Sequence, residues 1–307
     1  MAKTADRLLE GIKRRGQIAA TANNLDDDDI LAVADDVIET RLVPMLITLR
    51  QDYFVTSVDR ATVADQAAYT IPARAVMRTL RDLKLRDSSD STRDLRRVTP
   101  EDCHRYPSGE FPHAFYLKGD QYVIVPPPTS TNYTLEEWYE LRPNRLVKLA
   151  RAAQVASFTA TTVTVTTAPT TITTGVVVDF VSGTSGCRTL AMDKTVTNVA
   201  STVYSFAAGD IPSTLAVGDY VSVYGTAPVV QLPDECSALV ETIATQRLLR
   251  ALGDFEGANA LSDERSDEEK FIKSIGEPRV QGEQTIILNR AGLLRGGRGR
   301  RRVGPFF

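Results

Sequence analysis

The stretch that decides the fold reads SFTATTVTVTT over residues 157–167, where threonine alternates with alanine or valine for much of its length. Alternation with a period of two is typical of a strand with one exposed face, and β-branched residues favour strands. The region 151–230 contains 17 threonines and three more runs of this kind, separated by glycines: residues 176–181, 202–206 and 219–224. We therefore predict an inserted all-β domain over residues 151–227, built as a small barrel or sandwich.

Helical patterns lie on both sides of this Thr-rich region. Before it, residues 4–15 and 26–49 carry apolar side chains at intervals of three and four, and after it residues 233–252 and 255–275 do the same. Each pattern predicts a helix with one apolar face, which must be buried against another element. We predict that the two blocks pack together as a helical bundle core. Residues 1–150 and 228–284 would then form one discontinuous domain of an α+β protein.

Four consecutive acids, Asp26–Asp29, begin the second of these helices. Anions are favoured in the first turn of a helix, where they accept hydrogen bonds from free backbone N–H groups. A calcium loop would need alternating oxygen ligands and a central glycine, which this run lacks. We therefore predict that the acids cap the helix, and that Pro44 kinks or ends it further on.

Short strands are predicted between the first helical block and the insert. The alternating or apolar runs are residues 69–72, 80–86, 115–117, 122–125 and 135–141. Residues 118–121 (KGDQ) predict a hairpin turn between two of them. In the last run, the alternation places Leu135, Glu137, Tyr139 and Leu141 on one face.

Composition and motifs exclude several classes of protein. Hydrophobic residues make up 42% of the chain and charged residues 24%, with a net charge of −3, as in ordinary globular proteins. The three cysteines (Cys103, Cys187 and Cys236) are far apart, and no apolar run approaches the length of a membrane span. No phosphate loop, HExxH motif or zinc-spaced Cys/His cluster occurs. We predict no metal, no cofactor and no membrane contact.

Two groupings of reactive side chains were weighed as catalytic sites. Cys103 and His104 are adjacent, whereas a nucleophile and its base usually come from distant positions. Glu136, Glu137 and Glu140 surround Trp138, and paired carboxylates beside an aromatic ring can cleave sugars. A salt-bridged strand face explains the same pattern. We predict no catalytic residue and no enzymatic activity, and keep a carbohydrate-active tail accessory as an alternative function.

The last 23 residues form the stretch to which we assign a binding function. Residues 285–307 contain no acid, and their arginines and terminal aromatics are Arg290, Arg295, Arg298, Arg300, Arg301, Arg302, Phe306 and Phe307. One interpretation is a docking arm whose arginines bind carboxylates while the two phenylalanines fill an apolar pocket. Another is contact with nucleic-acid phosphates, which gives a second alternative function, a nucleic-acid-binding protein.

The order of these segments resembles the head-to-tail adaptor (connector) proteins of tailed bacteriophages, of the short-tailed phage type. The resemblance covers roughly residues 25–145 and 230–275. It rests on the acidic-start helix DDDDILAVADDVIETRLVPMLITLRQDYF, the Tyr-x-Ile-Pro strand at 69–72, the Leu-x-Asp-Leu-x-Leu strand at 80–85, the strand that closes in Trp138-Tyr139-Glu140-Leu141-Arg142-Pro143, and the helix that Pro233-Asp234-Glu235 opens.

The resemblance implies a structural virion protein that is made in the host cytoplasm and located at the head–tail interface. Such adaptors form a homo-oligomeric ring of twelve copies beneath the portal protein, contact the tail nozzle or hub protein, and form part of the conduit through which DNA passes. Residues 285–307 would dock on the portal or on a neighbouring subunit. The family usually passes directly from the Arg-Pro strand to the next helix, so the insert at 151–227 is a departure from its pattern.

Overall fold

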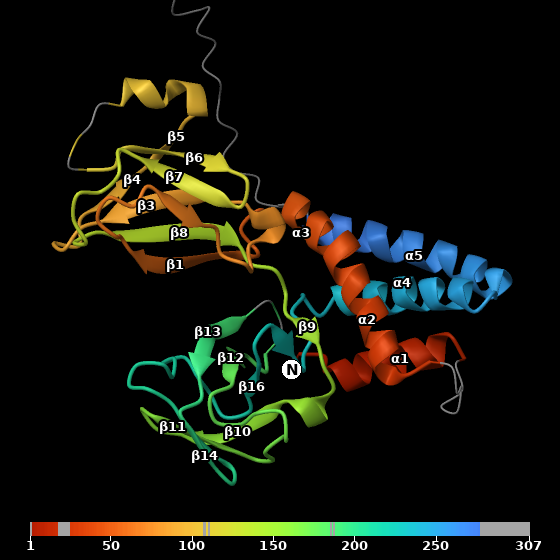
Figure 1. The fold of residues 1–307 in the computed structure, drawn as a ribbon. Coiled ribbons are helices and arrows are strands. Elements are labelled where there is room, and N and C mark those ends of the chain that lie inside the picture. The colour runs from red at the N-terminus through yellow and green to blue at the C-terminus, as the bar shows by residue number, and fades with distance from the viewer. Residues whose placement is uncertain are drawn as a thin grey trace, which may run out of the picture.

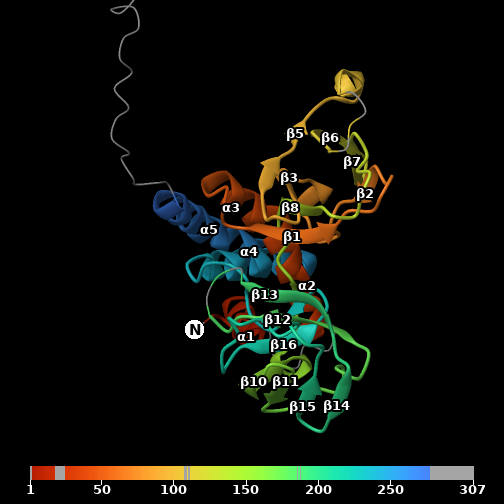
Figure 2. The same ribbon diagram turned by 90° about the vertical axis from the view of Figure 1, so that its left-hand side faces the viewer.

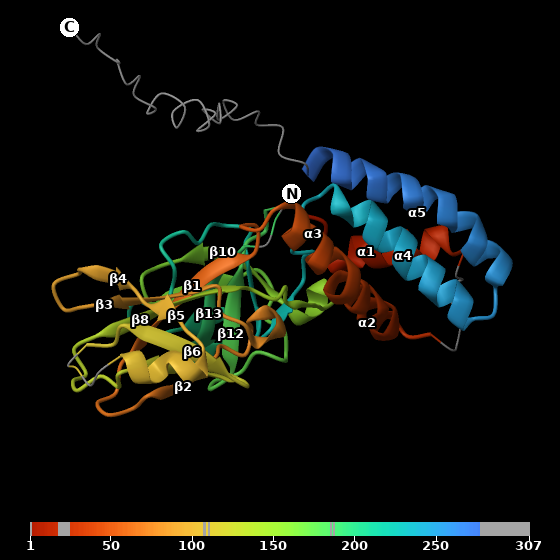
Figure 3. The same cartoon turned by 90° about the horizontal axis from the view of Figure 1, so that it is seen from above.

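The computed structural model describes residues 2–17, 25–106, 109, 111–184, 186 and 188–276. These residues form three parts: a helical part, a pair of four-stranded sheets, and a curled seven-stranded sheet. Figures 1 and 3 show both β parts on the same side of the helices. Figure 2 shows the two β parts one above the other, with the helices reaching the level between them.

The helical part joins segments from both ends of the described chain. Its elements are α1 (Ala5–Arg15), α2 (Asp27–Val37), the π-helical segment η1 (Ile38–Leu42), α3 (Val43–Leu49), α4 (Cys236–Ala251) and α5 (Phe255–Gly276). Helix α4 lies at the centre, in contact with α1, α2 and α5, and contributes Leu239, Val240 and Ile243 to a shared apolar cluster. The helix pattern of the sequence is therefore confirmed, and Gly253, with φ +85°, directly follows the C-cap of α4.

Pro44 does not end the helical path in which it lies. The chain runs from α2 through η1 into α3, and the amide of Val43 donates to the carbonyl of Ile38, five residues earlier. Pro44 then occupies the first turn of α3, where a missing N–H costs least. The π-helical turn of η1 directly precedes the first turn of α3, which holds the proline, and keeps α2 and α3 in one continuous helical path.

The upper β part in Figure 1 consists of two sheets that enclose one apolar cluster. One sheet has the order β1 (Val55–Ala61), β8 (Thr134–Glu140), β3 (Asp82–Arg86), β4 (Thr92–Asp94), and the other the order β2 (Ala68–Thr70), β7 (Gln121–Val125), β6 (Ala114–Lys118), β5 (Arg96–Arg97). Leu95 links β4 to β5 and is itself buried in the cluster, so one extended segment changes from the first sheet to the second. We call this part the sandwich.

The Thr-rich region forms the curled sheet. Its strand order is β13 (Thr189–Thr195), β12 (Val177–Val181), β16 (Tyr220–Val223), β10 (Ala153–Phe158), β11 (Thr162–Val165), β15 (Val203–Ser205), β14 (Asn198–Ala200). The two edge strands, β13 and β14, are consecutive in the chain and only a short turn apart. The sheet must therefore curl until its edges approach each other, around a cluster that includes Phe180, Tyr204 and Val221.

The chain enters and leaves the curled sheet at one place. The outgoing strand β9 (Arg145–Leu146) pairs in parallel with the returning strand β17 (Thr226–Ala227). The amide of Arg145 donates to Gly225 O at 2.9 Å, and the amide of Val147 to Ala227 O at 3.0 Å. Adjacent entry and exit strands allow the region between them to be added without rearranging the rest of the fold.

The prediction of a helical bundle as the core of the molecule is wrong. The described chain is α+β overall, but strands dominate it, and two of its three large apolar clusters belong to sheets rather than helices. The physical reason is that each β part buries its own side chains. The sandwich and the curled sheet therefore do not depend on the helices for a core, and the helices are one of three packed parts.

Candidate interaction surfaces

A buried ionic junction connects the sandwich to the curled sheet. Asp179 on β12 is completely buried and accepts two hydrogen bonds from Nη2 of Arg74, at 2.9 and 2.7 Å. Arg74 follows β2 in the sandwich and stacks over the ring of Tyr224, 4.3 Å from its centroid. Burial alone would lower the pKa of Arg74, but the hydrogen bond and charge of Asp179 raise it above the ordinary value.

Backbone and amide donors complete the shell around the carboxylate of Asp179. The amide of Gly225 donates to it at 2.9 Å, the amide of Asp193 at 3.1 Å, and Nδ2 of Asn144 at 3.2 Å. Asn144 lies directly before β9, in the outgoing connection. A single buried carboxylate therefore holds the sandwich, the connection and the curled sheet together, and a buried charge with this many partners is costly to disturb.

The acids at the start of α2 are confirmed as a helix cap and also bind cations. Asp26 and Asp29 form a capping box, with Asp26 as the cap residue. Asp27 pairs with Lys13 of α1 and with Lys148, and Asp28 pairs with Arg151. The hydrogen bond from Lys13, followed by that from Lys148, lowers the pKa of Asp27. These acids thus fix the connection to the curled sheet against α2.

The three glutamates of β8 do not converge on one site. Glu137 is completely buried between the sandwich sheets, where it accepts a hydrogen bond from the hydroxyl of Tyr122 at 2.6 Å and pairs with Nε of Arg60 at 2.9 Å. Burial raises the pKa of its carboxyl. Glu136 and Glu140 alternate with it and point to the other face of the strand. A glycosidase needs two carboxylates that face one substrate, and this strand separates them.

Cys103 and His104 do not form a nucleophile–base pair. Both lie on a short 3₁₀ helix, η3 (Pro100–Arg105). The Cys103 thiol contacts Thr99 O at 3.6 Å, and Nδ1 of His104 is 2.6 Å from Glu101 O. Each side chain is directed to the backbone of its own turn, so the thiol and the imidazole do not meet as a nucleophile and its base.

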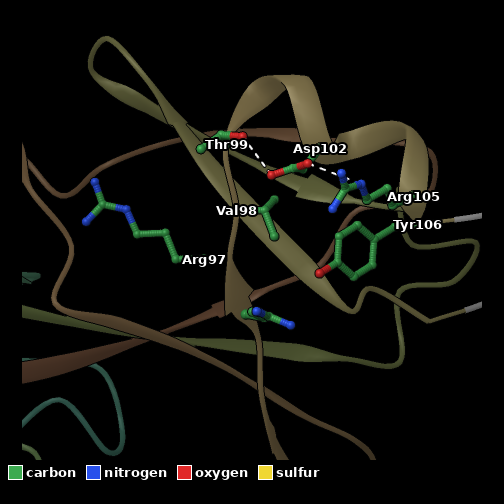
Figure 4. A pocket seen from close by; sticks show the side chains of 7 residues that line it. Arg97, Val98, Thr99, Asp102, Arg105 and Tyr106 are labelled. Carbon is green, nitrogen blue, oxygen red and sulfur yellow. Dashed lines mark hydrogen bonds and ion pairs between the residues drawn. The ribbon is translucent and has the colours of Figure 1, made fainter.

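An arginine-lined recess lies at the tip of the sandwich, beside η3 (Figure 4). It has a volume of about 390 Å³ and is lined by Arg96, Arg97, Val98, Thr99, Asp102, Arg105 and Tyr106. Asp102 accepts a hydrogen bond from the Thr99 hydroxyl at 3.0 Å and pairs with Arg105 at 3.3 Å. Figure 4 shows Arg97 on one side of the extended segment that carries Val98, and Arg105 with Tyr106 on the other.

Two of the recess arginines have no electrostatic partner in the described part of the chain. Arg96 and Arg97 are both exposed, and neither forms an ion pair or side-chain hydrogen bond with another described residue. The sequence analysis did not single out these arginines. The adjacent arginine pair in the segment RDLRRV, residues 93–98, was the signal available in the sequence.

Arg74 and Asp179 were also not predicted from the sequence. Asp179 interrupts the apolar run VVVDFV, and an acid in such a run indicates a buried charge that needs a partner. The predicted docking arm, residues 285–307, lies outside the described residues. The described chain ends with α5, whose last turn lies beside α3.

Among the described residues, the groups considered as catalytic do not converge, and exposed arginines lie at a surface recess. The model of the SU10 adaptor protein family matches residues 14–152. The match confirms the predicted resemblance to phage head-to-tail adaptors for this segment, which includes the end of α1, the α2–α3 helix, the sandwich and β9. No curated protein matches the chain.

The match supports a structural rather than an enzymatic role, as a phage adaptor located in the virion. A head-to-tail adaptor family implies contact with portal and tail proteins. None of the helices in the described residues is both long enough and apolar enough to cross a membrane.

Proposed function

We propose that the protein forms a ring of twelve copies beneath the portal, connects the capsid to the tail, and encloses part of the path of the DNA during ejection. The observation that carries the proposal is the family match over residues 14–152, which covers the α2–α3 helix and the sandwich. The geometry supports the same role, because the described surface offers ion-paired and exposed charged faces to partners but no converging set of catalytic side chains.

Within this function each part of the chain has a proposed role. Residues 1–150 and 228–284 form the adaptor core, and residues 151–227 form an added domain whose entry and exit strands lie side by side at β9 and β17. Residues 285–307 form an arm that docks on the portal or on a neighbouring subunit. The tail nozzle or hub protein is the proposed partner on the opposite face of the ring.

A ring makes weak contacts sufficient. When twelve subunits bind one portal, each contact after the first is intramolecular, so the total affinity far exceeds that of a single subunit. A repeated contact between unlike surfaces closes into a ring when the rotation per subunit is correct, and it leaves the outer face free for an added domain.

The test uses the purified chain and the portal protein of the same phage. The mixture is separated by size and imaged by negative-stain electron microscopy, with a second variant that ends at Gln284 as a comparison. We expect rings of the full-length chain on one end of the portal, and weaker or no binding by the variant. Absence of binding at any salt concentration would contradict the adaptor function.

A further inference from the structure

We propose that copies of this chain contact one another head to tail, with Phe255 at the α4–α5 turn of one copy inserted into the arginine recess of the next. The inference rests on the proposed function, because it supplies the contact between ring subunits. It goes beyond that function because it names the two surfaces in contact. Their contact can be tested separately from binding to the portal.

The α4–α5 turn exposes large apolar side chains to solvent. Phe255 is 64% exposed and Leu252 is 52% exposed, and the residues between them are exposed as well. Exposed aromatic side chains that lie close to a second apolar residue are unusual on a free surface and are common at protein contacts. The turn is therefore an apolar projection at the end of a rigid helical hairpin.

Carboxylates flank this projection. Asp254 caps α5 by accepting the amide of Gly257 at 2.8 Å, which leaves its second oxygen for another donor. Glu256 forms no ion pair with any residue in the described ranges. The two carboxylates on either side of Phe255 thus carry negative charge that the described fold does not neutralise.

The recess has the opposite chemistry. Its guanidinium groups at Arg96 and Arg97 are exposed, while Val98 and Tyr106 are half-buried and provide apolar walls. A volume of about 390 Å³ is ample for one phenyl ring. An aromatic side chain in a pocket, surrounded by arginine–carboxylate pairs, is the usual composition of a binding hot spot.

The two surfaces lie at opposite ends of the molecule. Figures 1 and 3 both show η3, the gold coil beside β5 and β6, at one end and the blue α4–α5 turn at the other. A contact between unlike surfaces at opposite ends joins copies head to tail, and such contacts produce rings or filaments. Two surfaces on the same face would produce a closed dimer instead.

A second copy fits the recess better than nucleic acid does. A phosphate backbone would satisfy Arg96 and Arg97 but would leave the apolar walls of the recess unfilled and Phe255 exposed. The whole chain is acidic, with a net charge of −3, so a neighbouring copy brings carboxylates to the recess without another component. Both unsatisfied surfaces are accounted for by one contact.

Two one-sided variants test the proposal. The recess variant is Arg96→Glu with Arg97→Glu, and the turn variant is Phe255→Ser with Glu256→Lys. All four residues are exposed, so the fold should tolerate both changes. As a control, Arg41→Glu with Lys273→Glu introduces the same change of charge as the recess variant at exposed positions outside both surfaces. Self-association is measured by analytical ultracentrifugation, and copies per portal by mass photometry.

We expect the wild type and the control to associate with copies of themselves, either in solution or on the portal. Each one-sided variant should associate at least roughly 30-fold more weakly. An equimolar mixture of the two variants should form dimers and stop there, because each pair retains one intact contact. Three results would overturn the proposal. Either variant could associate as strongly as the wild type, the mixture of variants could remain monomeric, or the wild type could fail to associate both in solution and on the portal.

Two further readouts separate the proposal from its alternatives. Binding of each monomeric variant to immobilised portal tests the adaptor function independently of the subunit contact. Duplex DNA of 30 base pairs is the probe for a nucleic-acid site. If the recess variant loses DNA binding but still associates like the wild type, the recess binds nucleic acid and the proposed contact is wrong.

Discussion

Arg74 and the pair Arg96 and Arg97 belong to the same sandwich but serve different purposes. The side chain of Arg74 is 10% exposed, is bound by a buried carboxylate, and is covered by the ring of Tyr224. Arg96 and Arg97 are exposed and have no ion pair among the described residues. The difference teaches that the fold uses the first charge to join its own parts and leaves the other two for a partner.

The largest expected effect comes from removing the charge that holds Arg74. Asp179→Asn keeps the shape of the side chain but leaves the buried guanidinium without its counter-charge. It also places an NH₂ group among donors. We expect a loss of about 3–5 kcal/mol in the free energy of unfolding. Urea unfolding measures it, with the fluorescence of Trp138, the only tryptophan, as a signal from the sandwich.

Asp193→Asn is the matched control, since Asp193 also pairs with Arg74, at 3.2 Å, but is 59% exposed. Its backbone has φ +60°, which asparagine tolerates. We expect a cost within about 1 kcal/mol. Equal losses in the two variants would contradict the assignment of the junction to Asp179.

The second effect concerns pH at the contact between α2 and β9. Asp35 accepts the amide of Leu146 in β9 through both oxygens, at 2.9 and 3.1 Å. Burial, with the nearby charges of Glu39 and Asp36, raises its pKa to about 7, against the effects of the Leu146 hydrogen bond and Arg145. Between pH 4 and 7 the folded protein therefore holds a proton that the unfolded chain has released, and stability falls as pH rises through this range.

Asp35→Asn removes this dependence and keeps an acceptor for Leu146. Relative to the wild type, the variant should gain stability as pH rises from about 4 to about 7, by up to about 1.4 kcal/mol per pH unit, and remain level above pH 8. Urea unfolding at four pH values measures the difference. The same change at exposed Asp36 should give a flat difference, and a flat result for Asp35→Asn would show that burial does not perturb this carboxyl.

The third effect is the contribution of an exposed carboxylate, that of Asp26, to the stability of the fold. Asp26 caps α2, so Asp26→Ala should cost about 0.5–2 kcal/mol, because free N–H groups of the first turn lose their acceptor. Thermal unfolding measures it. Asp36→Ala, in the same helix but away from its first turn, should change little. A loss no larger than that of the control would mean that the capping box contributes nothing.

The smallest effect is expected at the tip of the sandwich. Arg96→Ala with Arg97→Ala should change the free energy of unfolding by no more than about 0.5 kcal/mol, because neither side chain is bound within the described fold. Urea unfolding of the monomer measures it. A large loss of stability would mean that these arginines support the fold, and would remove the basis for treating them as free to bind a partner.

Local signals in the sequence predicted the local structure well. The acids Asp26–Asp29 marked a helix start, which is confirmed. Alternation in residues 135–141 correctly placed Leu135, Glu137 and Tyr139 on the buried face. Each of these features depends on neighbours within a few residues, which is why pattern reasoning can find them.

Long-range features could not be predicted in the same way. Strand β1 was not anticipated, and it pairs with β8 across a large part of the chain, from Val55 opposite Glu140 to Ala61 opposite Thr134. The helical bundle core was overestimated because long helices give strong local patterns while short strands give weak ones. The partner of Asp179 could not be predicted from the sequence, because Arg74 approaches it only when two separate β parts pack together.

The most direct test of the account is a cryo-electron microscopy structure of the chain bound to the portal of its phage. We expect a closed ring beneath the portal in which Phe255 of each subunit lies in the recess formed by Arg96, Arg97 and Tyr106 of the next. A ring in which both surfaces face solvent would contradict the subunit contact. Portal particles without any bound chain would contradict the adaptor function itself.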